Sequence, residues 1–222
     1  MDLFDLDHTL IGTGTIFPNS IEGRDWIAFH CTSTYYAPAI EANGFSSTKP
    51  IDPNDLALLQ TLSKRCGVDT SGVDGFLALR TISFSPVAEL ALCYSDPATR
   101  GGQGLKFVNA VANELLTNHA PALDNQERAR LNDILGLIAT IQNSDAVIYA
   151  VDFQGLDKSM AHYDSVLKTI KATAALPPDR IVARLLIPGV VNCASINQTA
   201  HRERLQRIFW SPQRHFLKEM KA

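Results

Sequence analysis

The sequence predicts an α+β domain whose strands are separated by long helical segments. Strand-like apolar runs occupy residues 25–31, 146–153 and 180–187, and each is short. Residues 105–117 and 124–142 lie between the first two runs, and 124–142 carries apolar side chains at helical spacing. Because these helical segments are long and unevenly placed, the pattern lacks the regular strand–helix alternation of a doubly wound sheet.

Capping and turn residues place the remaining elements. Asp52 and Pro53 are typical of a helix start, whereas Gly44 is typical of a helix end. In chain order we expect a strand at 25–31, helices at 36–43 and 52–66, a strand at 76–85, helices at 86–94, 105–117 and 124–142, a strand at 146–153, a helix at 157–173 and a strand at 180–187.

Three segments make up the predicted domain organisation. Residues 1–24 form an acidic N-terminal arm with an irregular lead-in, and residues 25–199 form the folded domain. Residues 200–222 carry six Lys/Arg against two Glu and are predicted to form a basic C-terminal helix. At 222 residues and 45% hydrophobic content, the chain can bury a core without disulfides or metals.

The charge and the apolar runs narrow the possible functions. A net charge of −3 argues against nucleic-acid binding over the whole surface but leaves a local basic patch open. No apolar run reaches the roughly 20 residues that span a bilayer, and the acidic start is unlike a signal peptide. We therefore expect a cytoplasmic protein with no membrane span.

The four cysteines, at positions 31, 66, 93 and 193, do not form a C-x-x-C pair. Structural zinc sites need ligands that are more tightly clustered than this. We interpret the cysteines as free thiols of a reducing compartment and predict no metal site from them.

The N-terminal residues Asp5-Leu6-Asp7-His8-Thr9 resemble the opening motif of haloacid-dehalogenase-type phosphatases. In that family the first Asp accepts the phosphoryl group and the second is a general acid/base, beside Mg²⁺. The resemblance implies roles for Asp5 and Asp7, with Lys106, Asp152 and Asp157 as candidates for the remaining motifs. A Mg²⁺-dependent phosphatase is therefore one alternative function.

A second resemblance covers about residues 25–190. Four segments resemble signatures of the ADP-ribosyltransferase superfamily, in the expected order: Ile27–Ser33 followed by Asn43-Gly44-Phe45, Arg80–Ser85 followed by Ala91–Ser95, Ala146–Asp152, and Pro178–Ala183. In the first, a strand that contains a histidine is followed by a helix that ends in glycine, here His30 and Gly44. The resemblance implies a split β-sheet core with long helical insertions.

The same resemblance implies that NAD is the substrate. The expected activity is mono-ADP-ribosylation of a macromolecule. We expect the target to be a protein, and nucleic acid is the alternative target. Transferases of this kind are often bacterial toxins or effectors, so delivery to a host cytosol is an alternative location. The implied catalytic residues are Asp179 and His30, and the implied NAD-binding residues are His30, Thr32, Ser33, Tyr36, Ser83 and Phe84.

The residue types suit this chemistry. Loss of nicotinamide passes through a positively charged ribose, which a nearby carboxylate stabilises. Where the superfamily has glutamate, this chain offers Asp179, which is one methylene shorter, or in another register Arg184. A catalytically inactive NAD-binding module is therefore the second alternative function.

Overall fold

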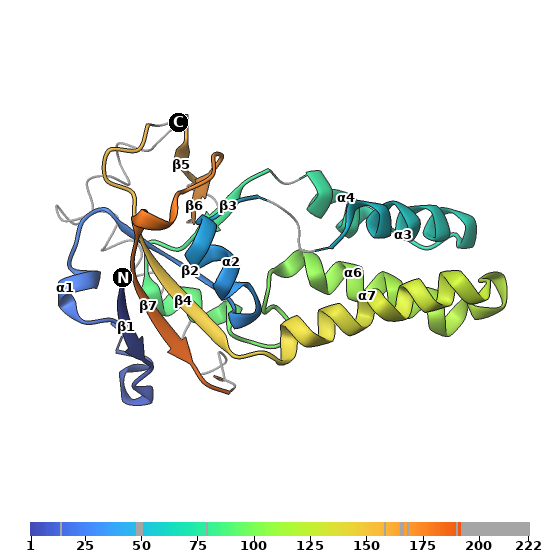
Figure 1. The fold of residues 1–222 in the computed structure, drawn as a ribbon, viewed down its shortest axis with the longest axis horizontal. Helices are drawn as coiled ribbons and strands as arrows, with labels where there is room; N and C mark the ends of the chain where they lie inside the picture. Colours follow the sequence, from blue (N-terminus) through green and yellow to red (C-terminus); the bar gives the residue numbers. More distant parts are fainter. Residues whose placement is uncertain are drawn as a thin grey trace.

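The computed structural model is a mixed fold of helices and strands with two β-sheets. It describes residues 1–191 apart from 14, 48–50, 79, 158, 165–166, 168 and 190, so the predicted basic helix lies outside the described residues. Figure 1 shows an elongated molecule in which helices extend to one side of the sheets. We call the part that contains all the strands the sheet body, and the extended helices the helical lobe.

The first sheet has the strand order β1-β7-β4-β2. Its strands are β1 (Asp2–Asp5), β2 (Ile27–Ser33), β4 (Ala146–Asp152) and β7 (Ile181–Ile187). β1 runs parallel to β7, whereas β2 and β7 both run antiparallel to the central strand β4. β4 is buried along almost its whole length because it is covered on both faces.

The second sheet joins the first at one point. It contains β3 (Ile82–Phe84), β5 (Ala161–Asp164) and β6 (Thr169–Ala172), all antiparallel, in the order β3-β6-β5. Phe29 of β2 and Ser85 exchange two backbone hydrogen bonds of 2.8 and 2.7 Å. The two sheets therefore separate on either side of this bridge.

The helical lobe consists of α3 (Pro53–Cys66), α4 (Ser71–Ala78), α6 (Gln103–Asn118) and α7 (Asn125–Asn143). Its own core is formed by apolar side chains spaced at helical intervals, such as Leu131, Ile134 and Ile138 of α7. The short helices are α1 (Asn19–Glu22), α2 (Ala37–Asn43) and α5 (Ala88–Ala91), with 3₁₀ turns η1 (His8–Leu10), η2 (Thr34–Tyr36), η3 (Leu92–Tyr94), η4 (Ala120–Ala122) and η5 (Pro178–Arg180).

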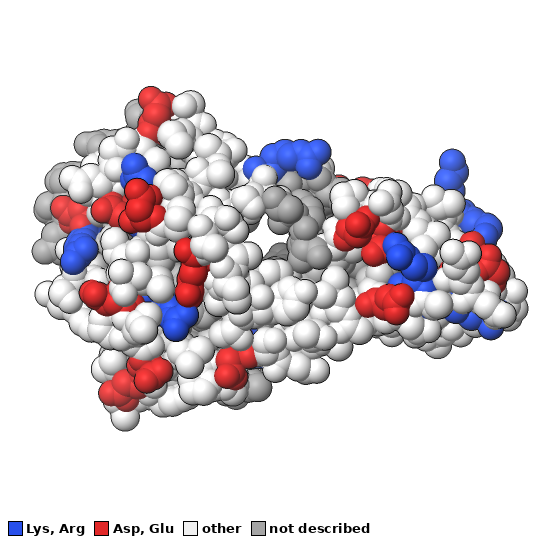
Figure 2. All heavy atoms as spheres, in the orientation of Figure 1, with Lys and Arg blue, Asp and Glu red and all other residues white. Residues whose placement is uncertain are grey.

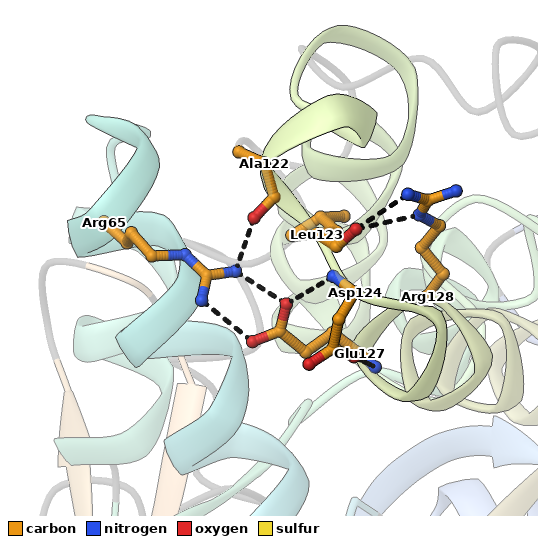
Figure 3. A network of polar contacts seen from close by, with 6 residues as sticks. All are labelled: Arg65, Ala122, Leu123, Asp124, Glu127 and Arg128. Carbon is orange, nitrogen blue, oxygen red and sulfur yellow. Dashed lines mark hydrogen bonds and ion pairs between the residues drawn. The ribbon is translucent and has the colours of Figure 1, made fainter.

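A polar network ties α3 to the start of α7 (Figure 3). Asp124 caps α7, since its carboxylate accepts the amide of Glu127 at 2.8 Å and the Glu127 carboxylate accepts the amide of Asp124 at 2.9 Å. The guanidinium of Arg65 donates to both oxygens of Glu127, at 2.9 and 2.7 Å. The side-chain hydrogen bonds from Arg65 lower the pKa of the Glu127 carboxyl.

Arg100 holds the lobe to the sheet body. Its side chain is buried, with 3% of the residue exposed, and its hydrogen-bond partners among the described residues are backbone carbonyls. Nε and Nη2 donate to Ser95 at 3.0 and 2.6 Å, and Nη2 also donates to Gly189 at 3.1 Å. Nη1 donates to Gln142 at 3.1 Å and to Ser144. One guanidinium therefore joins η3, the C-terminal end of α7 and the turn after β7.

Two expectations about local structure are wrong. Instead of a helix over 157–173, the chain forms the hairpin β5–β6, whose residues alternate between buried and half-buried. The buried set, Ala161, Tyr163, Ile170 and Ala172, packs in one core with Phe84 and Phe153. Instead of a strand over 76–85, α4 continues to Ala78 and only Ile82–Phe84 is a strand.

The N-terminal segment is not a separate arm. Residues 2–5 form β1 at the edge of the first sheet, and its two Asp side chains are exposed there. Ile16, Phe17 and Ile21 are buried in the same core as Phe29. An edge strand is solvated along one side and tolerates charge, so it lacks the apolar pattern by which strands are found in sequences.

We predict that Arg100→Met lowers the free energy of unfolding by more than about 3 kcal/mol, because each buried carbonyl left without a partner costs about 1–3 kcal/mol. Arg100→Lys should not restore stability, since an ammonium cannot supply the planar set of donors. Urea denaturation measures both. Arg130→Ala is the control and should cost less than about 1 kcal/mol, because Arg130 is 48% exposed in its pair with Asp55. Equal losses in the two variants would contradict this role.

Candidate functional site

His30 lies on β2 next to the bridge between the two sheets. Its Nδ1 atom lies 2.9 Å from the carbonyl oxygen of Ser83 on β3. The imidazole packs against Phe45 and Phe84, with ring centroids 5.1 and 5.3 Å apart. Successive residues of a strand point to opposite faces, so Phe29 points into the core of the first sheet while His30 points to the face shared with β3.

The contact with Ser83 fixes the proton of the His30 ring. A carbonyl oxygen can only accept, so Nδ1 donates and carries the hydrogen. Burial lowers the pKa of His30, and the hydrogen bond to the Ser83 carbonyl offsets part of that effect. The ring is therefore neutral near pH 7, and Nε2 presents a lone pair that can accept a hydrogen bond from a hydroxyl.

A row of polar side chains crosses the first sheet from His30. His30 pairs in register with Tyr149 of β4, and Tyr149 pairs with Arg184 of β7. Residues paired in register share one face of a sheet, with Cα atoms about 5 Å apart, so His30 and Arg184 are about 10 Å apart. Glu41 of α2 covers this row: its Oε1 accepts from the Tyr149 hydroxyl at 3.1 Å and from Nη1 of Arg184.

Tyr149 is fully buried, and its phenol stays protonated. Burial raises the pKa of Tyr149, and the nearby Glu41 carboxylate raises it further. Phe45, which contacts the His30 ring, also contacts the ring of Tyr149 at 5.6 Å. His30 and Tyr149 therefore both contact the ring of Phe45.

The structure brings three of the predicted site residues together. His30, Ser83 and Phe84 meet at the junction of the sheets. The contact with Ser83 is through its main chain, and its side chain is exposed. Phe84 is buried against Phe153 at 5.0 Å, so its ring serves the core and offers no open face for a base.

Thr32 and Ser33 follow His30 along β2, and both are buried. The hydroxyl of Ser33 donates to the carbonyl of Ile141 at 2.7 Å and accepts the amide of Tyr35 at 3.1 Å. Ser33 therefore caps η2 and ties β2 to the end of α7. Thr32 lies on the same face as His30, two residues further along the strand.

Tyr36 lies apart from His30, because its ring packs against the core of the helical lobe. Burial raises its pKa, and among the described residues nothing hydrogen-bonds to its hydroxyl. An added Cβ on Gly101 would lie 3.4 Å from the Tyr36 ring, which places this tyrosine at the loop after Arg100.

Asp179 is exposed in η5, before β7 begins. It makes no hydrogen bond or ion pair with any other residue that the structure describes. The acid that reaches the polar row is instead Glu41, which the sequence analysis did not select. One feature of the sequence could have pointed to Glu41: it is the only charged residue in the helical segment Ala37–Asn43.

The phosphatase candidates lie far apart. Asp5 is level with Leu186 and, through it, with Val147 at the start of β4. Asp152 lies at the other end of β4, five residues or about 17 Å along the strand. The Asp7 carboxylate accepts the amide and hydroxyl of Thr9 at 2.9 and 2.7 Å, as a cap of η1.

The other candidate residues do not join these acids. Asp157 accepts the amide of Ser159 at 2.7 Å within its own turn, and Lys106 lies on α6 in the helical lobe. Within the described part of the chain, no group of three His, Cys, Asp or Glu side chains could hold a metal ion. Cys31, Cys66 and Cys93 are not part of a disulfide, and Cys193 lies outside the described residues.

The lowered pKa of His30 predicts how stability depends on pH. Below about pH 6.5 the unfolded chain takes up a proton at this histidine whereas the folded chain does not, so the folded state loses stability as pH falls. His30→Gln removes this loss. Urea denaturation from pH 8 to pH 5 should show a constant stability difference between the two proteins above pH 7 that shifts in favour of the variant below pH 6.5. A constant difference throughout would contradict the assignment.

Comparison of the chain with protein-family models, with curated proteins and with solved structures gives no match. Among the described residues, no helix is both long enough and apolar enough to cross a membrane. On the face shown in Figure 2, acidic and basic side chains are interspersed over the sheet body and the helical lobe. The candidate site is therefore defined by the contacts of His30.

Proposed function

We propose that the protein binds NAD⁺ at the junction of the two sheets and is a mono-ADP-ribosyltransferase that modifies a macromolecular target, by expectation a protein. The observation that carries this proposal is the position of His30. It lies on the strand from which the second sheet diverges, and a hydrogen bond to Ser83 holds its ring. The resemblance of this strand to the transferase signature implies that the histidine binds the ribose.

The chemistry of the junction supports nucleotide binding. The neutral imidazole offers Nε2 as an acceptor for a ribose hydroxyl, and the exposed Ser83 hydroxyl on the neighbouring strand can donate or accept. Arg184 lies on the same face, where its guanidinium is paired with the Glu41 carboxylate.

A second candidate function is NAD⁺ binding without turnover. It is favoured by the position of Arg184, which is on the last strand and in line with Tyr149 and His30. A cation there opposes positive charge on the ribose, although its partner Glu41 offsets this. The two functions differ in one measurable respect, which is whether nicotinamide is released.

Calorimetry with the full chain tests the proposed site. We expect NAD⁺ to bind, and His30→Ala to weaken binding by about 1–3 kcal/mol, because a ligand hydroxyl loses its buried partner. His119→Ala is the matched control, since His119 lies on the helical lobe after α6 and should leave affinity unchanged. Absence of binding heat at millimolar NAD⁺ would refute the proposal. Incubation with labelled NAD⁺, scored for free nicotinamide and for labelled protein, separates transferase from binding module.

A further inference from the structure

Asp179, the acid that the sequence resemblance implies, is not held in place by its surroundings. Asp179 is exposed on a turn without a partner among the described residues. A group that stabilises charge in a transition state must be held in place before the reaction begins. The acid of this site should therefore be a carboxylate on the face of His30 whose position is fixed.

Glu41 meets this requirement. The Tyr149 hydroxyl donates to its Oε1 at 3.1 Å, and Arg184 donates to the same oxygen. Tyr149 is fixed because it is fully buried in the central strand, and Arg184 because it is on the adjacent strand. The two donors come from a rigid sheet, so they hold the carboxylate more firmly than a turn could.

The other oxygen of Glu41 remains open. Both described donors bind Oε1, and among the described residues nothing donates to Oε2. The Glu41 side chain is 29% exposed, so this oxygen can reach a ligand. The helix that carries Glu41 ends at Gly44, and the next residue, Phe45, contacts the His30 ring. Phe45 therefore links the segment that carries Glu41 to the His30 ring.

We propose that Glu41 is the catalytic carboxylate of this site, accepting a hydrogen bond from a ribose hydroxyl of NAD⁺ through Oε2, with Tyr149 and Arg184 as positioning residues. The inference rests on the proposed function. It replaces Asp179 as the acid, and it makes Arg184 a residue that orients the Glu41 carboxylate.

The proposed reaction transfers ADP-ribose from nicotinamide to the target. The bond between C1′ of the ribose and the nicotinamide nitrogen breaks, and its electron pair leaves with nicotinamide, which becomes neutral. The positive charge passes to C1′ and its ring oxygen, where the Glu41 carboxylate stabilises it. A nucleophilic oxygen or nitrogen of the target, or water in its absence, then bonds to C1′ and releases one proton to solvent.

The test measures nicotinamide release and NAD⁺ affinity on the full chain. Glu41→Gln keeps the size of the side chain and removes its charge. It should lower kcat about a hundredfold or more while the Kd for NAD⁺ stays within about threefold. Glu114→Gln, an exposed glutamate on α6 of the helical lobe, is the matched control and should leave both values unchanged. Asp179→Asn tests the competing acid.

Three further variants separate catalysis from folding. Glu41→Asp keeps the charge beside Arg184 but withdraws the carboxylate by one methylene, and it should lower kcat at least tenfold. Arg184→Met should lower kcat with little change in KM, because it frees Glu41 to move; Arg184→Lys should restore part of the rate. A merely structural role of Arg184 would instead change thermal stability and leave kcat of the folded protein unchanged.

The outcomes distinguish the two proposals. Loss of turnover in Asp179→Asn with normal turnover in Glu41→Gln would overturn the assignment of Glu41 alone. A wild-type chain that binds NAD⁺ but releases no nicotinamide would also overturn it and favour the binding module. A wild-type chain that binds no NAD⁺ would overturn the proposed function and, with it, this inference.

Discussion

The pair of backbone hydrogen bonds between Phe29 and Ser85 is the constraint on which the site depends. These two bonds are the point at which the second sheet leaves the first. One residue further along β2, the His30 side chain reaches the next available carbonyl, that of Ser83. If the sheets continued side by side, the main chain of β2 would use that carbonyl, and the imidazole would have no such partner.

The helical lobe is built independently of this junction but is anchored close to it. It has its own core and its own polar network between α3 and α7, and it meets the sheet body where α7 leads into β4. At that connection Arg100 satisfies carbonyls from three segments, and Ser33 binds the last turn of α7. The strand that carries His30 is therefore held at one end by the lobe and at its middle by Ser85.

The row of His30, Tyr149 and Arg184 places polar groups on a sheet that is otherwise mostly apolar. Tyr149 and the strands on either side of it are mostly apolar and buried, so charges on this face lose hydration. Glu41 and Arg184 compensate each other, and each keeps about a third of its side chain exposed. A half-buried ion pair adds little net stability, so its physical consequence is orientation more than strength.

Several elements were determined by the sequence itself. The helices at 52–66, 105–117 and 124–142 and the strand at 146–153 agree closely with α3, α6, α7 and β4, because helical periodicity, end caps and continuous apolar runs are local properties. His30 was selected through a motif resemblance, and the structure supplied its contacts.

Only the tertiary structure decided the rest. The hairpin β5–β6 replaced a predicted helix because β3 and the core beneath it provide a partner that residues 157–173 cannot reveal alone. The parallel edge strand β1 formed because β7, some 180 residues later, offers it backbone partners. Glu41 and Arg184 are 143 residues apart in the chain, and they meet because strand register and helix packing bring them together. Strand register and helix packing depend on residues far apart in the chain. No local sequence pattern could therefore show that Glu41 is the acid that contacts Tyr149 and Arg184.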